Sequence, residues 1–166
     1  MPPPIHVLLA DGHPVCLAAL AEMTARLPGV AVAGTVPTGP ELLARLAHTP
    51  AGVVLLDADL PPAGGLETTR RLKGAHPGTY VLLLALDNPL ALVKKMLAAG
   101  ASGYVSKTAG RGELERAIRT VASGRPYFGE HVAAELARQY TLESNPPAPG
   151  TCPDSAPCPT ALISKG

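Results

Sequence analysis

The stretch VVLLDADLP at residues 53–61 decides the fold of this chain. Four branched apolar residues in a row are typical of a strand buried on both faces, as in parallel sheets. Asp57 ends the run, and a loop containing Asp59 and Pro61 follows it. The pattern therefore predicts a carboxylate at the carboxyl end of a buried strand, which is where open α/β sheets bind their ligands.

Two other apolar runs also end in ionisable residues. Asp11 follows the run IHVLLA at residues 5–10, and Lys107 follows the run GYVS at residues 103–106. The carboxyl ends of parallel strands lie along one edge of a sheet, so these side chains are expected to meet. We expect the ammonium group of Lys107 to lie within salt-bridge distance of Asp57.

Strand and helix signals alternate from residue 5 to about residue 123. The expected strands are residues 5–10, 30–36, 52–57, 80–85 and about 103–106. Five such repeats predict an α/β fold: a flavodoxin-like, doubly wound, five-stranded parallel sheet of order 2-1-3-4-5, with three layers in the sequence α/β/α. In that order strands one and three are neighbours, which brings Asp11 next to Asp57.

Short motifs mark the ends of two helices. Thr38 and Glu41 have the spacing of a capping box, which predicts a helix start. Asn88 and Pro89 suit the cap and first turn of the fourth helix, and Gly100 is expected to end it. The residues of that helix expected to face the sheet are Leu90, Val93 and Leu97.

The chain is expected to divide into three parts. Residues 5–125 form the α/β domain, residues 126–141 a linker helix, and residues 142–166 a Pro-rich tail that is too poor in apolar residues to order itself. One side of the linker helix is expected to consist of Val132, Leu136 and Tyr140. Cys16 falls in the first helix, where we expect a small core or boundary residue.

Composition excludes several classes of protein. The net charge is +1 and no long basic run occurs, which argues against strong nonspecific binding to nucleic acids. The apolar runs are too short to span a bilayer. Met1 is followed by prolines rather than by a charged region and an apolar core, so no secretory signal is recognised. A cytoplasmic location without membrane attachment is the expectation.

Four stretches carry a resemblance to a known family. They are VLLADGHP at residues 7–14, VVLLD at 53–57, GGLE at 64–67 and AAGASGYVSK at 98–107. From about residue 5 to residue 125 the chain resembles a receiver domain of a bacterial two-component response regulator. More narrowly, it is similar to the LuxR/NarL-type subfamily, whose receivers precede a LuxR-type helix-turn-helix.

The resemblance implies a role for five residues. Asp57 matches the aspartate that accepts a phosphoryl group from a histidine kinase, and Lys107 matches the lysine that binds the phosphoryl oxygens. Asp11 matches the first acid of the pair that holds Mg²⁺, and the backbone carbonyl of Asp59 matches a further metal ligand. Tyr104 matches the aromatic switch residue.

Two positions depart from the family pattern. Gly12 stands where the second acid of the metal-binding pair is expected, and Ala85 stands where a Thr or Ser hydroxyl binds the phosphoryl group. One fewer carboxylate predicts weak or absent Mg²⁺ binding, with affinity lowered roughly 10–100-fold. Loss of the hydroxyl removes a charge-assisted hydrogen bond of about 1.5–3 kcal/mol. The site is therefore expected to be degenerate, and the side chain of Asp59 is one possible substitute for the missing acid.

These departures leave two functional hypotheses. The first is a signalling domain, not an enzyme, that controls transcription in a phosphorelay and accepts phosphoryl on Asp57 poorly or not at all. The second is a phosphorylation-independent pseudo-receiver switched by a small ligand or by protein contacts. An unrelated flavodoxin-like enzyme is disfavoured, because no Gly-rich phosphate loop follows the first strand.

Partners and electrostatics complete the expectations. A histidine kinase is a possible partner, and DNA is expected to bind only through a module that these residues do not contain. A homodimer is expected through the face formed by helix 4, strand 5 and helix 5, with Lys94 and Lys95 on the outer side of helix 4. Asp11 and Asp57 are like charges at close range, so the pKa of at least one of them is expected to be raised.

Overall fold

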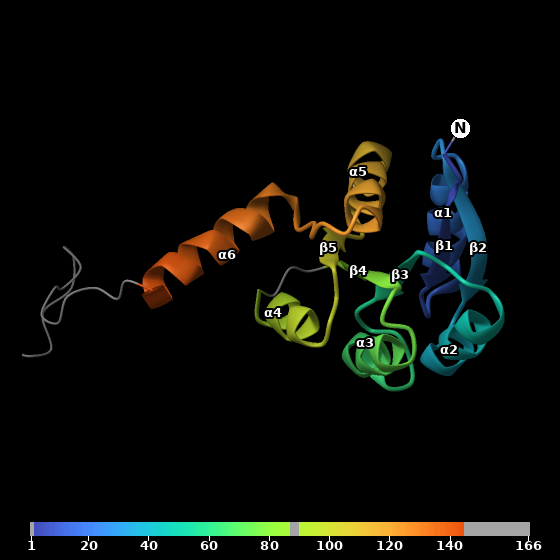
Figure 1. The fold of residues 1–166 in the computed structure, drawn as a ribbon, viewed down its shortest axis with the longest axis horizontal. Coiled ribbons are helices and arrows are strands. Elements are labelled where there is room, and N and C mark those ends of the chain that lie inside the picture. Colours follow the sequence, from blue (N-terminus) through green and yellow to red (C-terminus); the bar gives the residue numbers. More distant parts are fainter. Residues whose placement is uncertain (1, 87–89, 145–166) are drawn as a thin grey trace, which may run out of the picture.

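The computed structural model describes residues 2–86 and 90–144. Its sheet has five strands, all neighbouring pairs are parallel, and their order is β2-β1-β3-β4-β5. Helices α1 and α5 cover one face of the sheet, and α2, α3 and α4 cover the other (Figure 1). The predicted doubly wound, three-layer flavodoxin-like fold is confirmed.

The elements follow the predicted alternation. The strands are β1 Ile5–Ala10, β2 Val30–Val36, β3 Val53–Asp57, β4 Tyr80–Ala85 and β5 Gly103–Ser106. The helices are α1 Pro14–Ala25, α2 Gly39–His48, α3 Gly64–Ala75, α4 Leu90–Ala98, α5 Arg111–Ala122 and α6 Gly129–Ser144. The predicted cap at Asn88 and Pro89 lies outside the described residues.

Alternation along the central strands divides the core into two layers. In β1, Leu8 and Ala10 belong to the layer under α2, α3 and α4, whereas Val7 and Leu9 belong to the layer under α1 and α5. Successive strand residues point to opposite faces, and both faces of this sheet are covered, so every residue of β3 is buried. This explains why the decisive stretch is apolar throughout.

Sequence patterns explain α2 and α4, two of the three helices that cover the same face of the sheet. The Thr38 side chain accepts a hydrogen bond from the backbone N–H of Glu41 at 3.3 Å, as the capping box predicts. In α4, Val93 is buried as expected, and Leu90 and Leu97 pack against the same layer. Met96 is also buried, which the sequence reading missed.

Helix α6 differs from the expected linker helix. It continues to Ser144, three residues beyond the expected helix end at residue 141, and residues 145–166 lie outside the described part of the chain. Val132 is buried, but Tyr140 is 72% exposed rather than aligned with the core. Helix α6 runs outward from the sheet next to α4, where Lys94 and Glu143 form an ion pair at 3.8 Å (Figure 1).

The segment between α5 and α6 is attached to β5. The backbone N–H of Tyr104 donates to the carbonyl of Tyr127 at 2.8 Å, and the N–H of Tyr127 donates to the carbonyl of Ser102 at 3.3 Å. A Cβ atom on Gly103 would overlap the Tyr127 carbonyl oxygen. Only glycine therefore permits this close approach of the two backbones.

None of the helices in the described residues has the length and apolar character needed to cross a bilayer.

Candidate functional site

Three ionisable residues meet at the carboxyl edge of the sheet. Asp11 follows β1, Asp57 ends β3 and Lys107 follows β5, and the pairing of Ala10 with Leu56 sets the two acids side by side. The Lys107 ammonium lies 2.8 Å from Asp11 Oδ2 and 3.0 Å from Asp57 Oδ1. The predicted ion pair with Asp57 is present, and Lys107 bridges both acids.

The carboxylate of Asp57 is only partly satisfied. Its Oδ1 accepts from Lys107 and from the backbone N–H of Asp59 at 3.1 Å. Its Oδ2 is buried and has no hydrogen-bond partner among the described residues. A buried oxygen without a donor costs about 1–3 kcal/mol, a cost that a bound cation or hydrogen-bond donor would remove.

Hydrogen bonds, rather than repulsion, determine the ionisation of Asp11. Burial acts to raise its pKa, but the hydrogen bond from Lys107 and those from His13 outweigh burial, and the net pKa is lowered. The His13 backbone N–H donates to Asp11 Oδ1 at 2.8 Å. Asp11 is therefore not the acid whose pKa is raised, because the positive charge of Lys107 stabilises its carboxylate.

The pKa of Lys107 moves in the complementary direction. Burial acts to lower it, but hydrogen bonds to Asp11 and Asp57 and their negative charges outweigh burial, so the pKa is raised. The ammonium is therefore charged across the physiological range, and the ion pairs persist.

Within the described residues, one group of side chains has the spacing of metal ligands. It comprises Asp11, His13 and Asp57, whose ligand atoms all lie within 4.8 Å of one another. The carboxylate of Asp59 is not part of it, and Asp59 is exposed. Sequence reasoning assigned His13 no role, although its position two residues after Asp11 could have drawn attention to it.

The residues fit a divalent cation, but with a reduced set of oxygen ligands. Asp11 and the free Oδ2 of Asp57 supply carboxylate oxygens, whereas Gly12 supplies none. A bound ion would neutralise the charge that develops on a transferring phosphoryl group. A Cβ atom on Gly12 would lie 2.7 Å from Cδ of Pro61, so the Pro61 ring crowds the position that a second acid would need.

Ala85 and Tyr104 lie in the same core layer below the site. Tyr104 is 4% exposed and Ala85 is 7% exposed. Position 85 offers no hydroxyl, but its carbonyl accepts from the Lys107 backbone N–H at 2.9 Å. The backbone of β4 therefore holds Lys107 in place. The side chain at position 85 cannot supply the Thr or Ser hydroxyl that the family pattern has there.

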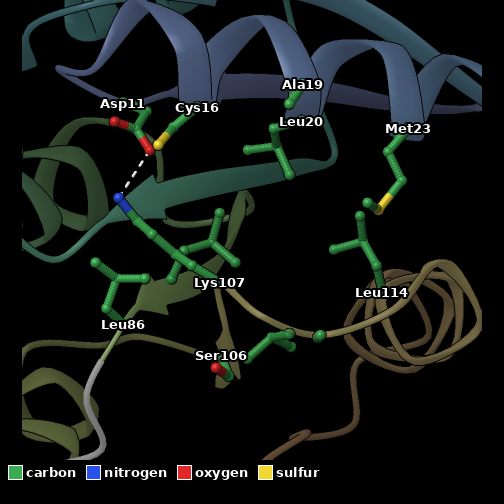
Figure 2. Close-up of a pocket in the computed structure, with 12 residues that line it drawn as sticks. Asp11, Cys16, Ala19, Leu20, Met23, Leu86, Ser106, Lys107 and Leu114 are labelled. Atoms are coloured by element: carbon green, nitrogen blue, oxygen red, sulfur yellow. Dashed lines mark hydrogen bonds and ion pairs between the residues drawn. The ribbon is translucent and has the colours of Figure 1, made fainter.

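A mostly apolar cavity of about 190 Å³ opens beside the site. Figure 2 shows Cys16, Leu20 and Met23 of α1 on one side and Leu114 of α5 on another, with Asp11 and Lys107 at one end. Cys16 is exposed, so its expected place in the core or at its boundary is corrected. The cavity is large enough to admit a small apolar group next to the ion pairs.

Comparisons with known proteins agree with this geometry. The family model described as "Response regulator receiver domain" matches residues 7–119. The chain is 35% identical to Response regulator GacA of Pseudomonas viridiflava over 133 residues. The match covers 80% of this chain and 62% of GacA. Response regulator UvrY of Escherichia coli K12 is 32% identical over 133 residues, 80% of this chain and 61% of UvrY.

A solved structure shows the same fold. The crystal structure of a two-component response regulator of the LuxR family from Aurantimonas sp. SI85-9A1 is 29% identical, with a TM-score of 0.78. The match covers 83% of this chain and 99% of that one. The chain spans about 62% of the length of the GacA relative. With the family match, the strand order and the Asp11–Asp57–Lys107 cluster together, the chain belongs to the response regulator receiver domain family.

Proposed function

We propose that this chain is an atypical cytoplasmic receiver that accepts a phosphoryl group on Asp57 poorly or not at all, and that it acts in transcription control. A histidine kinase is the proposed phosphodonor, and DNA would be contacted by a separate module. The relatives GacA and UvrY are named as response regulators, which supports a role in two-component signalling.

One observation carries the proposal of poor phosphorylation. Gly12 provides no carboxylate for a metal ion, and the Pro61 ring crowds the space above its Cα. Phosphoryl transfer depends on a cation that neutralises the transferring oxygens, so a weaker cation site slows the reaction. Ala85 compounds the effect, because it offers no hydroxyl to the phosphorylated state.

Incubation with acetyl phosphate and Mg²⁺ is expected to label the unaltered chain only to a small extent. Intact-mass measurement gives the phosphorylated fraction, and Asp57→Asn sets the background. The double variant Gly12→Asp/Pro61→Ala, which restores the acid and removes the crowding ring, should phosphorylate about 10–100-fold faster. Gly12→Asp alone should gain less because of the Pro61 contact.

Rapid and complete labelling of the unaltered chain at low Mg²⁺ would contradict the proposal. Equal labelling of the Asp57→Asn variant would show that the phosphoryl group is attached elsewhere.

The second candidate function is a pseudo-receiver that responds to a small ligand. The cavity between α1 and α5 favours it, because Asp11 and Lys107 line one end of an otherwise apolar space (Figure 2). This alternative predicts that Asp57 of the unaltered chain remains unmodified even under strong forcing conditions with acetyl phosphate and Mg²⁺. Ala19→Phe, which narrows the cavity, should then abolish the response to a ligand without affecting phosphorylation chemistry.

We also propose that the face formed by α4, β5 and α5 is a constitutive partner or homodimer surface. Part of it lies next to α6, where Lys94 pairs with Glu143, whereas Lys95 is exposed. In the receiver family, a hydroxyl at the position of Ala85 couples the phosphoryl group to the aromatic residue at the position of Tyr104. Ala85 lacks this hydroxyl, so phosphorylation has a weaker means of changing the face. A ligand shifts an equilibrium only through a difference in its interactions with the two states.

Self-association is therefore expected to be the same with and without beryllofluoride. Sedimentation velocity measures it, and Lys95→Glu should weaken it, whereas Arg70→Glu on α3 should not. A monomer that dimerises only with beryllofluoride would restore an ordinary phosphorylation switch.

A further inference from the structure

We propose that the acid pocket prefers a first-row transition ion such as Zn²⁺ or Co²⁺ to Mg²⁺, with His13 as the third protein ligand. In this arrangement the imidazole takes over the function of the carboxylate that Gly12 lacks. The inference concerns the same pocket as the proposed function. It is tested by metal binding alone, so either proposal can fail without the other.

The loop after β1 already holds His13 beside the acids. His13 is the residue before α1, and its backbone N–H is fixed by Asp11 Oδ1 at 2.8 Å. Its Nδ1 lies 3.3 Å from the same oxygen. The imidazole is 70% exposed, so an ion can reach it from solvent without opening the core.

The charges in the pocket favour a further cation. Lys107 is paired with two carboxylates, so the three groups together carry one net negative charge. The free Oδ2 of Asp57 is buried and has no donor among the described residues. A metal ion would satisfy this oxygen and remove the cost of leaving it unpaired.

The types of ligand decide which ion is preferred. Mg²⁺ requires oxygen ligands in near-octahedral geometry, and the loss of a carboxylate at position 12 weakens such a site. Imidazole nitrogen suits Zn²⁺, Co²⁺, Ni²⁺ and Cu²⁺, which also accept carboxylate oxygens. Two carboxylates and one imidazole therefore bind these ions better than they bind Mg²⁺, with water completing the coordination.

Isothermal titration of the unaltered chain with Zn²⁺, Co²⁺ and Mg²⁺ tests the preference. Zn²⁺ and Co²⁺ are expected to bind at least about tenfold more tightly than Mg²⁺. His13→Ala should weaken Zn²⁺ and Co²⁺ binding about 10–100-fold and leave Mg²⁺ binding unchanged. His48→Ala, an exposed histidine at the end of α2, is the matched control and should behave as the unaltered chain.

The visible absorption of bound Co²⁺ identifies the ligands independently of affinity. The spectrum should change in His13→Ala and Asp57→Asn and should be the same in Cys16→Ser, because Cys16 lines the same cavity as Asp11 but is not one of the proposed ligands. Thermal unfolding of each variant without metal establishes that it is folded, and His13→Gln provides a second substitution at the same position.

Three results would overturn the proposal. They are Mg²⁺ binding as tight as that of Zn²⁺, Zn²⁺ binding that survives both substitutions of His13, and a Co²⁺ spectrum that depends on Cys16 but not on His13.

Discussion

Lys107→Met is expected to lower the free energy of unfolding by about 3–5 kcal/mol at neutral pH. The substitution keeps most of the apolar side chain but removes the ammonium that contacts both Asp11 and Asp57. Both carboxylates are almost completely buried, so two negative charges would remain close together with little solvent to screen them. Urea denaturation followed by circular dichroism measures the change.

The pH dependence of stability separates this electrostatic effect from a simple loss of packing. The pKa of Asp11 is lowered from its ordinary value of 3.8, so its contribution is present above that pH and is lost as the pH falls through the folded-state pKa. The pKa of Lys107 is raised from 10.5, so its contribution is present below that pH and is lost as the pH rises through the folded-state pKa.

The variant should show the opposite dependence in acid. Without Lys107, protonation of a buried aspartate relieves repulsion, so Lys107→Met should lose less stability than the unaltered chain, or even gain some, as the pH approaches 4. Adding Asp57→Asn should recover much of the loss at neutral pH. Arg70→Met, at an exposed position of α3 outside the proposed association surface, should change stability by less than about 0.5 kcal/mol. A Lys107→Met variant as stable as this control would refute the ion-pair account.

Gly103→Ala is expected to destabilise the domain by about 1–3 kcal/mol and to loosen the attachment of α6. The added Cβ would overlap the carbonyl of Tyr127 and lie 3.1 Å from its backbone N and C atoms. Backbone cannot move aside as a flexible side chain can, so the hydrogen bond from Tyr104 to Tyr127 should be weakened or broken. Hydrogen exchange at Tyr104 and protease cleavage within α6 should both accelerate.

Gly112→Ala is the matched control. Gly112 lies in the first turn of α5, and a Cβ there meets nothing within 4 Å. Alanine favours the helix over glycine, so this variant should be as stable as the unaltered chain or more stable by up to about 1 kcal/mol. Similar effects of the two substitutions would mean that the contact with Tyr127 does not constrain β5.

The sequence was sufficient for the fold and for the three central site residues. Strand and helix signals alternate along the chain, 2-1-3-4-5 is a common strand order for five such repeats, and parallel strands bring their carboxyl ends to one edge. Asp11, Asp57 and Lys107 could therefore be placed together from their positions in the chain alone. Their distances follow from the register of the sheet, in which Ala10 pairs with Leu56 and Ala85 pairs with Ser106.

Other features depend on contacts that a linear pattern does not encode. The position of His13 follows from a loop hydrogen bond to Asp11, and the crowding of Gly12 comes from Pro61, almost fifty residues later. The lowered pKa of Asp11 reflects the geometry of Lys107 rather than the simple proximity of two acids. Tyr140 has helical spacing from Leu136, but its side chain is 72% exposed even though Glu143, one turn further along α6, still pairs with Lys94 of α4.

The attachment of Tyr127 to β5 has a consequence for regulation. β5 is four residues long, with Gly103 and Tyr104 bound to the segment before α6, and Lys107 follows its other end. Thermodynamic linkage is reciprocal. Suppose that a cation or phosphoryl group bound at Lys107 changes how β5 holds this segment, and thereby changes the affinity of α6 for a partner. A partner that repositions α6 must then change the affinity of the acid pocket for that cation or phosphoryl group by the same factor. Such a partner would act as an effector of the pocket without touching it, and the reciprocity would not require a hydroxyl at position 85.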